Sequence, residues 1–152
     1  MKIVAIIQAR MGSIRLPGKV LKKIGNKNLI EIILERLSHS NEINEIVVAT
    51  SVDSKNDVLQ KFVESLNYNC FRGSEKDVLE RYFMCAERFN ADAVVRVTGD
   101  CPLVDAELVD DLIKQFKKSN VDYLSNVEPS TFPDGLDTVS YTHLTLPTSH
   151  CV

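Results

Sequence analysis

Apolar residues follow two different spacings along the first 118 positions. Residues 2–8 are a continuous, largely β-branched apolar run followed by a loop rich in glycine, serine and proline, which is typical of a strand buried on both faces. Residues 45–50 and 93–97 repeat this pattern, and residues 68–71 form a shorter run. The pattern predicts four strands.

Helical spacing occurs between these runs. Residues 29–37 carry an apolar stripe, and a second helix is predicted from Ser54, which with Asp57 resembles a capping box, through residue 66. Asp77 is a candidate N-cap for a helix whose apolar stripe runs to Phe89, and Asp105 for a helix that ends near residue 118.

Strands that alternate with helices predict an α/β fold: a three-layer α/β/α, Rossmann-like, mainly parallel sheet. Parallel neighbours need crossover connections, and both faces of such a sheet must be covered. Ligands bind at the carboxyl ends of the strands in these sheets. The loops after residues 8, 50, 71 and 97 are therefore the candidate site.

Composition limits the classes of protein. The chain has 152 residues, 44% hydrophobic and 26% charged, which suits one packed domain. It contains no eighteen-residue apolar stretch and no signal-type cleavage segment, so we expect a cytoplasmic protein with no membrane partner. The cysteines are too dispersed for paired metal ligands and are expected to be reduced and mostly buried: Cys70, Cys85, Cys101 and Cys151.

Positive charge is concentrated at the start of the chain. The first thirty residues hold seven lysines and arginines and no acid, although the net charge of the whole chain is −3. A nucleic-acid partner is not expected, because nucleic-acid binders are more often basic overall or along several elements. A phosphorylated small molecule fits the pattern better.

The loop after the first strand, QARMGSIRLPGK from residue 8 to 19, contains the chemistry for a polyphosphate. Gly12 and Gly18 allow close backbone approach, and Arg10, Arg15 and Lys19 add three cations. Charge-assisted hydrogen bonds contribute roughly 1.5–3 kcal/mol each, so two or three could dominate triphosphate binding. The spacings of the P-loop and of the dinucleotide fingerprint are both absent. The alternative is a solvated basic loop.

Residues 9–19, ARMGSIRLPGK, resemble the signature of the sugar-acid cytidylyltransferases, which are the CMP-ulosonate and CMP-acylneuraminate synthetases, and particularly the spore coat polysaccharide biosynthesis branch. The resemblance covers about residues 1–138. It continues through VATS at 48–51, FRGS at 71–74, DVLERY at 77–82, RVTGDCP at 96–102 and FPDGLD at 132–137.

The resemblance implies a fold of the nucleotide-diphospho-sugar transferase type and a reaction. A sugar hydroxyl attacks the α-phosphorus of CTP, pyrophosphate leaves, and a CMP-sugar forms with the assistance of Mg²⁺. The expected partners are CTP and a sugar or sugar acid, with a homodimer for the full-length protein. By similarity, the phosphates would meet Arg10, Arg15 and Lys19, and the nucleotide pocket would include Ala9, Gly12 and Ser13.

Asp100 follows the strand at 93–97, and the resemblance implies that it holds the magnesium ion. One or two protein carboxylates together with substrate phosphates usually suffice for Mg²⁺. An aspartate two residues before Pro102 could equally be a turn former. The second metal-binding carboxylate of the family lies beyond the matching region, so none is assigned.

Arg72, Gly73 and Ser74 match the loop of the family that contacts the base. From the residues alone, Arg72 could instead be a surface residue that pairs with Glu75 or Asp77.

Asp134 and Asp137 resemble the stretch that binds the sugar, although Pro-Asp-Gly is also a general turn signal. Two residues outside the site are expected to be structural: Tyr82 in the core, and His39 on the surface at a helix end.

Residues 139–152, VSYTHLTLPTSHCV, contain no acidic residue, lysine or arginine. An uncharged edge strand or a frayed terminus is one interpretation. Family members continue here with charged, helical sequence, so the other interpretation is translated cloning or adapter sequence. The second interpretation predicts a partial nucleotide-binding domain at residues 1–138, incomplete at its C-terminus, and a non-native tail.

Two other functions remain open. A nucleotide-sugar-dependent glycosyltransferase of related fold normally has an Asp-x-Asp metal motif, whereas Asp100 is followed by Cys101 and Pro102. An inactive nucleotide-binding fragment is the other alternative.

Overall fold

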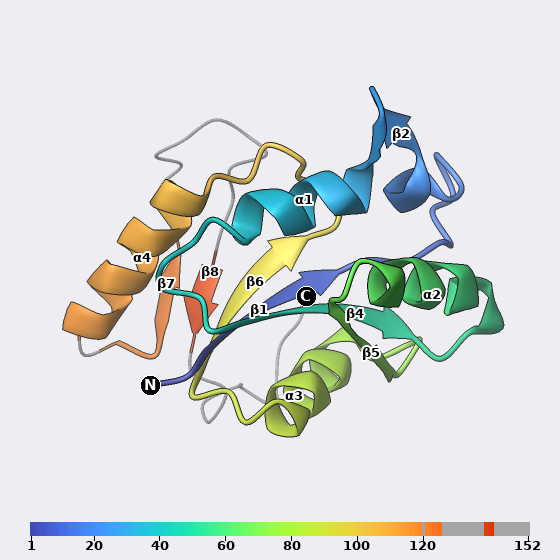
Figure 1. The fold of residues 1–152 in the computed structure, drawn as a ribbon. Coiled ribbons are helices and arrows are strands. Elements are labelled where there is room, and N and C mark those ends of the chain that lie inside the picture. The colour runs from blue at the N-terminus through green and yellow to red at the C-terminus, as the bar shows by residue number, and fades with distance from the viewer. Residues whose placement is uncertain (120, 126–138, 142–152) are drawn as a thin grey trace.

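The computed structural model describes residues 1–119, 121–125 and 139–141, and its centre is a six-stranded sheet (Figure 1). The strand order is β5-β4-β1-β6-β8-β7. The first four strands are parallel, while β8 runs antiparallel to both β6 and β7. The strands are β1 (Ile3–Gln8), β4 (Glu45–Ser51), β5 (Asn69–Gly73), β6 (Ala93–Thr98), β7 (Tyr123–Ser125) and β8 (Val139–Tyr141).

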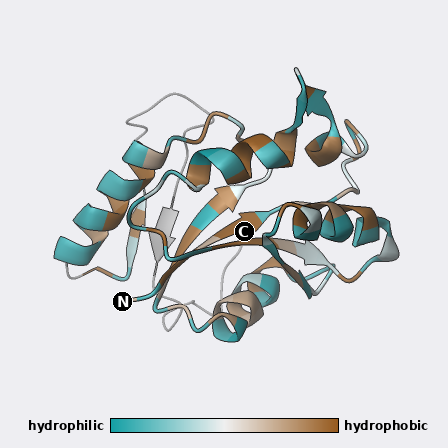
Figure 2. Ribbon diagram, in the orientation of Figure 1, coloured by the Kyte–Doolittle hydropathy of each residue, from teal (hydrophilic) through white to brown (hydrophobic). Residues whose placement is uncertain are grey.

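Helices cover both faces of the sheet, which confirms the predicted three-layer α/β arrangement. One face packs against α1 (Leu29–Leu37), α2 (Asp57–Ser65) and α4 (Ala106–Lys118), and the other against α3 (Val78–Arg88) (Figure 1). The central strands are mostly hydrophobic (Figure 2).

Side-chain alternation explains the continuous apolar run of β1. Val4 and Ile6 point into the core under α3, whereas Ala5 and Ile7 point into the core under the other three helices. All four side chains are fully buried, as the run predicts. Tyr82 is buried in the α3 core and His39 is exposed, so both of these expectations are confirmed.

Three of the four predicted helix starts are close to the observed ones, and the start predicted at Ser54 is wrong. The carboxylates of Asp77 and Asp105 accept backbone N–H groups of α3 and α4, as predicted. Asp53 accepts the N–H of Lys55 at 2.9 Å, so a 3-10 turn, η2 (Ser54–Asn56), forms first and α2 begins at Asp57. The carboxylate one position earlier replaces the predicted capping hydroxyl.

Several small elements were not predicted. Lys19–Leu21 is a 3-10 turn, η1, and it leads into a hairpin of β2 (Lys23–Ile24) and β3 (Lys27–Asn28). Two-residue strands are too short to show a period of two, and Gly25, with φ 66°, makes the turn between them.

Two of the predicted reduced cysteines, Cys70 and Cys85, form no disulfide within the described part of the chain. Cys101 lies 2.9 Å from the Thr98 hydroxyl through its sulfur, and Cys151 lies outside the described residues. None of the described helices is long and apolar enough to cross a bilayer. The predicted foreign segment at 139–152 overlaps the described part of the chain only at β8, which lies between β6 and β7.

Candidate functional site

A pocket of about 540 Å³ lies at the carboxyl ends of β1 and β6. This is the edge at which ligands bind in parallel α/β sheets. The pocket brings together six predicted site residues, namely Ala9, Arg10, Ser13, Arg15, Lys19 and Asp100. Its other lining residues are Gln8, Ile14, Leu16, Val20, Thr98 and Gly99.

Residues 9–19, the basic loop, are closed by hydrogen bonds to one backbone carbonyl. The carbonyl of Met11 accepts the N–H groups of both Ser13 and Gly18 at 3.0 Å. Gly18 has φ 66°, a left-handed conformation that favours glycine. Gly12, another predicted site residue, is exposed and does not line the pocket, and an added Cβ there would meet nothing within 4 Å.

Gly99 brings β6 against the start of the basic loop. Its N–H donates to the carbonyl of Gln8 at 2.8 Å, and an added Cβ would lie 2.7 Å from that oxygen and 2.9 Å from the Cβ of Ala9. Only glycine fits so close an approach. The next residue, Asp100, is therefore held beside the loop.

Lys19 and Asp100 form an ion pair inside the pocket. Nζ of Lys19 lies 2.6 Å from Oδ2 of Asp100. The hydrogen bond from Lys19 holds the pKa of Asp100 below its usual value of 3.8, against the opposing effect of partial burial. Asp100 is therefore an ionised carboxylate at neutral pH, with half of its side-chain surface exposed.

The donor set suits a magnesium ion shared with phosphates. Within residues 1–119 and 121–125, no three acidic, histidine or cysteine side chains converge as a closed metal site. Mg²⁺ is commonly held by one or two carboxylates plus substrate phosphate oxygens. Asp100, in the same pocket as three cationic side chains, fits that pattern.

Arg72, Gly73 and Ser74 lie at the end of β5, separated from β1 by β4, and they do not line the pocket. The guanidinium of Arg72 donates to the carbonyls of Ser51 and Asp53 and to the side chains of Asp57 and Gln60. Its carboxylate partner is thus Asp57 rather than Glu75 or Asp77.

Close packing at the end of β5 explains the glycine that follows Arg72. An added Cβ at Gly73 would lie 2.9 Å from Cγ of Arg81, a side chain that is 3% exposed and donates to the carbonyl of Ser74. The Ser74 hydroxyl accepts the N–H of Asp77. Contact of residues 72–74 with a base stays a prediction.

The expected sugar-binding residues, Asp134 and Asp137, lie outside the described residues. Sequence reasoning missed the pocket roles of Gln8, Thr98 and Gly99. The last two stand inside the RVTGDCP motif, which could have identified them. It also missed Asn56, whose Oδ1 accepts the N–H of Met11 in the basic loop at 2.9 Å, a contact for which no motif gives a signal.

Comparison with known proteins supports a family assignment. Residues 4–135 match the profile of a family described as cytidylyltransferase. The chain is 46% identical to an uncharacterised protein of Methanocaldococcus jannaschii, over 82% of this chain and 51% of that protein. It is 39% identical to the spore coat polysaccharide biosynthesis protein SpsF of Bacillus subtilis, over 80% of this chain and 52% of that protein. The chain therefore spans about half the length of these curated relatives.

Solved structures support the same family assignment. A cytidylyltransferase from Leptospira borgpetersenii superposes with a TM-score of 0.90 at 36% identity, over 95% of this chain and 61% of that one. A CMP:2-keto-3-deoxy-manno-octonic acid synthetase complexed with CTP shares the fold, with a TM-score of 0.74 at 20% identity over 94% of this chain and 75% of that one. The chain belongs to the cytidylyltransferase family.

Proposed function

We propose that the pocket binds the triphosphate of CTP and that the enzyme transfers CMP from CTP to the hydroxyl of a sugar, with release of pyrophosphate. The proposed acceptor is a keto-sugar acid, and the product serves surface polysaccharide synthesis. The observation that carries this proposal is the convergence of Arg10, Arg15, Lys19 and Asp100 in one pocket at the carboxyl ends of β1 and β6. The family assignment supports it, as do the relatives, a spore coat polysaccharide biosynthesis protein and a CMP:2-keto-3-deoxy-manno-octonic acid synthetase.

The reaction requires charge neutralisation. The sugar hydroxyl oxygen forms a bond to the α-phosphorus and its proton passes to solvent water. The bond between that phosphorus and the bridging oxygen to the β-phosphate breaks, and pyrophosphate leaves with the electron pair. Negative charge accumulates on the leaving group, and positioned cations stabilise it. Arg10, Arg15 and Lys19 are the pocket's cations for this purpose.

Lys19 has a second role before the nucleotide binds, because its ammonium group forms an ion pair with the ionised Asp100 carboxylate. A triphosphate gives the Lys19 ammonium a competing anionic partner and leaves the Asp100 carboxylate available as an oxygen ligand. Asp100 together with triphosphate oxygens would hold Mg²⁺, which supplies further neutralisation of the phosphate charge.

Other parts of the proposal rest on the family resemblance. Arg72, Gly73 and Ser74 are proposed to contact cytosine, and Asp134 and Asp137 the sugar. A homodimer and a cytoplasmic location are proposed for the full-length protein.

Two substitutions in the basic loop test the phosphate site. We expect Arg15→Ala and Lys19→Ala each to weaken CTP binding about tenfold or more, because each removes a charge-assisted hydrogen bond to phosphate. Isothermal titration calorimetry measures the affinity, and urea unfolding should show little change in stability. Lys55→Ala, an exposed lysine outside the pocket, is the control. Unchanged affinity in both loop variants contradicts the proposal.

A second experiment tests the reaction class, with the full-length gene product that contains this domain. We expect pyrophosphate release from CTP only when a keto-sugar acid is present. Release of free nucleotide from a sugar nucleotide would instead identify a glycosyltransferase.

A further inference from the structure

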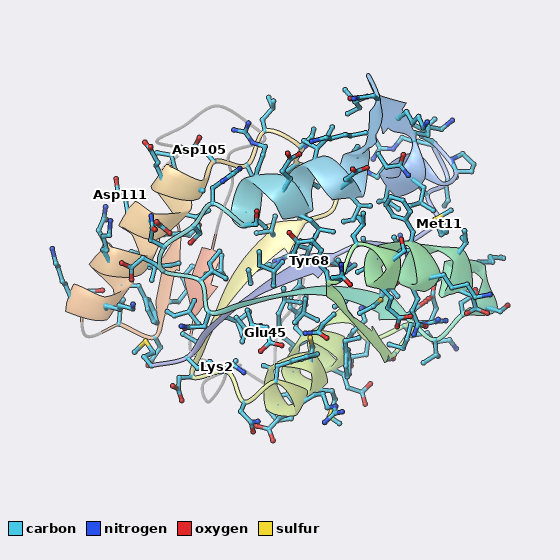
Figure 3. All side chains as sticks on the ribbon, viewed as in Figure 1. Lys2, Met11, Glu45, Tyr68, Asp105 and Asp111 are labelled. Atoms are coloured by element: carbon cyan, nitrogen blue, oxygen red, sulfur yellow. The ribbon has the colours of Figure 1, made fainter. Side chains whose placement is uncertain are left out.

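Asn56 links the turn after β4 to the basic loop. Its side chain is 3% exposed, and its Oδ1 accepts the N–H of Met11 at 2.9 Å across 45 positions of sequence. Its Nδ2 donates to the hydroxyl of Ser51 at 2.7 Å in a fully buried contact. Figure 3 shows Met11 beside α2, the helix that begins directly after Asn56.

The backbone of Met11 makes the hydrogen bonds that close the basic loop. Its carbonyl accepts the N–H groups of Ser13 and Gly18, and its N–H is the group held by Asn56. The residues on either side of these contacts include Arg10 and Lys19. Because Arg10 adjoins Met11 and Lys19 adjoins Gly18, the position of the Met11 backbone constrains two of the cations that line the pocket.

Arg72 fixes the turn that carries Asn56. Its guanidinium donates to the carbonyls of Ser51 and Asp53, before Asn56, and to the side chains of Asp57 and Gln60, after it. These four contacts hold both flanks of Asn56 against the end of β5. A continuous set of hydrogen bonds thus runs from β5, across the end of β4, to the basic loop.

We propose that Asn56 is a positioning residue, supported by Arg72, that orders the basic loop for the triphosphate. The expected effect on CTP affinity rests on the proposed CTP-binding function, whereas the ordering of the basic loop by Asn56 does not. An amide is well suited to the role, because one side chain satisfies a backbone donor through Oδ1 and a buried hydroxyl through Nδ2. A leucine of similar size satisfies neither group and leaves the Met11 N–H without this acceptor.

Asn44, an exposed residue at the other end of β1, provides a control for the loss of an asparagine acceptor. Its Oδ1 accepts the N–H of Ile3, the first residue of β1, at 2.7 Å, so it makes the same kind of contact to the backbone far from the pocket. Asn56→Leu and Asn44→Leu each remove an asparagine acceptor from a backbone N–H between residues 3 and 11. Only Asn56→Leu is expected to speed amide exchange in the basic loop.

The test combines amide hydrogen exchange with nucleotide affinity in the intact chain. We expect Asn56→Leu to speed exchange across residues 9–19 at least tenfold and to raise the Kd for CTP about tenfold. Binding of CMP, which has one phosphate, should change much less than binding of CTP. Asn56→Asp keeps an acceptor for Met11 and should restore the slow exchange of the loop.

Each outcome decides between a positioning role and a purely structural one. Equal effects of Asn56→Leu and Asn44→Leu on loop exchange, or slow exchange retained in Asn56→Leu, overturn the inference. If Asn56→Leu does not fold, Ser51→Ala keeps the Oδ1 contact to Met11 and removes the Nδ2 partner, together with a longer, 3.4 Å contact from the Asp53 N–H. It should still speed exchange in the loop several-fold; no increase overturns the inference. Failure of the unsubstituted protein to bind CTP refutes the proposed function and leaves the exchange result standing.

Discussion

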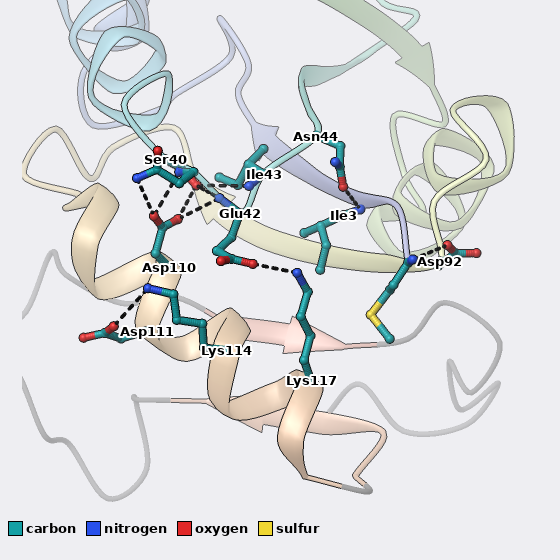
Figure 4. A network of polar contacts seen from close by, with 12 residues as sticks. Ile3, Ser40, Glu42, Ile43, Asn44, Asp92, Asp110, Asp111, Lys114 and Lys117 are labelled. Carbon is teal, nitrogen blue, oxygen red and sulfur yellow. Dashed lines mark hydrogen bonds and ion pairs between the residues drawn. The ribbon is translucent and has the colours of Figure 1, made fainter.

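At the scale of single residues, buried polar groups connect segments that are distant in sequence, and Asp110 is a second example besides Asn56. Asp110 lies on α4 and is 4% exposed (Figure 4). It accepts the hydroxyl of Ser40, the N–H of Asn41 at 2.9 Å and the N–H of Glu42 at 3.3 Å. One carboxylate thereby fixes the turn between α1 and β4.

Asp110→Asn should destabilise the protein by about 2–3 kcal/mol at pH 7, because hydrogen bonds to a charged group are worth roughly 1.5–3 kcal/mol and an amide places a donor among donors. Urea unfolding measures the loss. Asp111→Asn is the control, because Asp111 is exposed and lies 3.8 Å from Lys114 on the same helix surface, so its effect should stay within about 0.5 kcal/mol. Equal effects of the two substitutions would contradict this account of Asp110.

The destabilisation caused by Asp110→Asn should depend on pH. Burial by itself raises the pKa of Asp110, but the hydrogen bonds from Ser40, Asn41 and Glu42 outweigh it and hold the pKa below the usual 3.8. A lowered folded-state pKa stabilises the protein above the unfolded-state value, and the contribution is lost as the pH falls through the folded-state value. The stability gap between Asp110→Asn and the unsubstituted protein should therefore narrow below pH 3.8. A gap that stays constant into this acidic range would show that the carboxylate charge is not its cause.

At the scale of elements, sequence spacing located the long helices and strands well. The helix predicted at 29–37 has the observed bounds of α1, and the aspartate caps of α3 and α4 are where their side chains indicated. These features depend on local chemistry, which a sequence displays directly.

Contacts between distant elements were not predictable in the same way. The hydrogen bond from Met11 to Asn56 joins residues 45 positions apart, and the partners of Arg72 come from the end of β4, the turn after it and α2 rather than from its sequence neighbours. Spacing carries no information about such pairs, because they depend on the order of strands in the sheet. The basic loop, by contrast, was recognisable because its three cations lie close together in sequence.

The approach of β6 to β1 gives an element-scale prediction. Gly99→Ala places a Cβ 2.7 Å from the Gln8 carbonyl oxygen, so the strand ends must separate. We expect a destabilisation of about 1–3 kcal/mol in urea unfolding, as is usual for overpacking. Gly12→Ala, whose added methyl meets nothing within 4 Å, is the control and should leave stability nearly unchanged. Equal stability of Gly99→Ala and the unsubstituted protein would mean that the strand ends are not tightly held.

At the scale of the whole molecule, the sheet divides into a parallel part that carries the pocket and an antiparallel part at one side. The pocket residues come from β1, β6 and the loops after them, all within the family match. The strand β8 lies beyond that match and joins β6 to β7. Strand pairing uses backbone groups common to all residues except proline, so a segment foreign to the domain can still occupy this place.

Truncated chains test separately whether β8 stabilises the sheet and whether the sequence after it is foreign. Each partner strand of β8 pairs with it at three positions, and cross-strand pairs contribute roughly 0.2–1 kcal/mol each, so a chain of residues 1–138 should be less stable than residues 1–152 by about 1–6 kcal/mol. A chain of residues 1–141 keeps β8 and removes only sequence that we propose to be foreign, so its urea midpoint should match that of residues 1–152. A large loss on removing residues 142–152 contradicts the proposal that they are foreign. Equal stability of residues 1–138 and 1–152 would instead show that pairing with β8 contributes nothing to the stability of the fold.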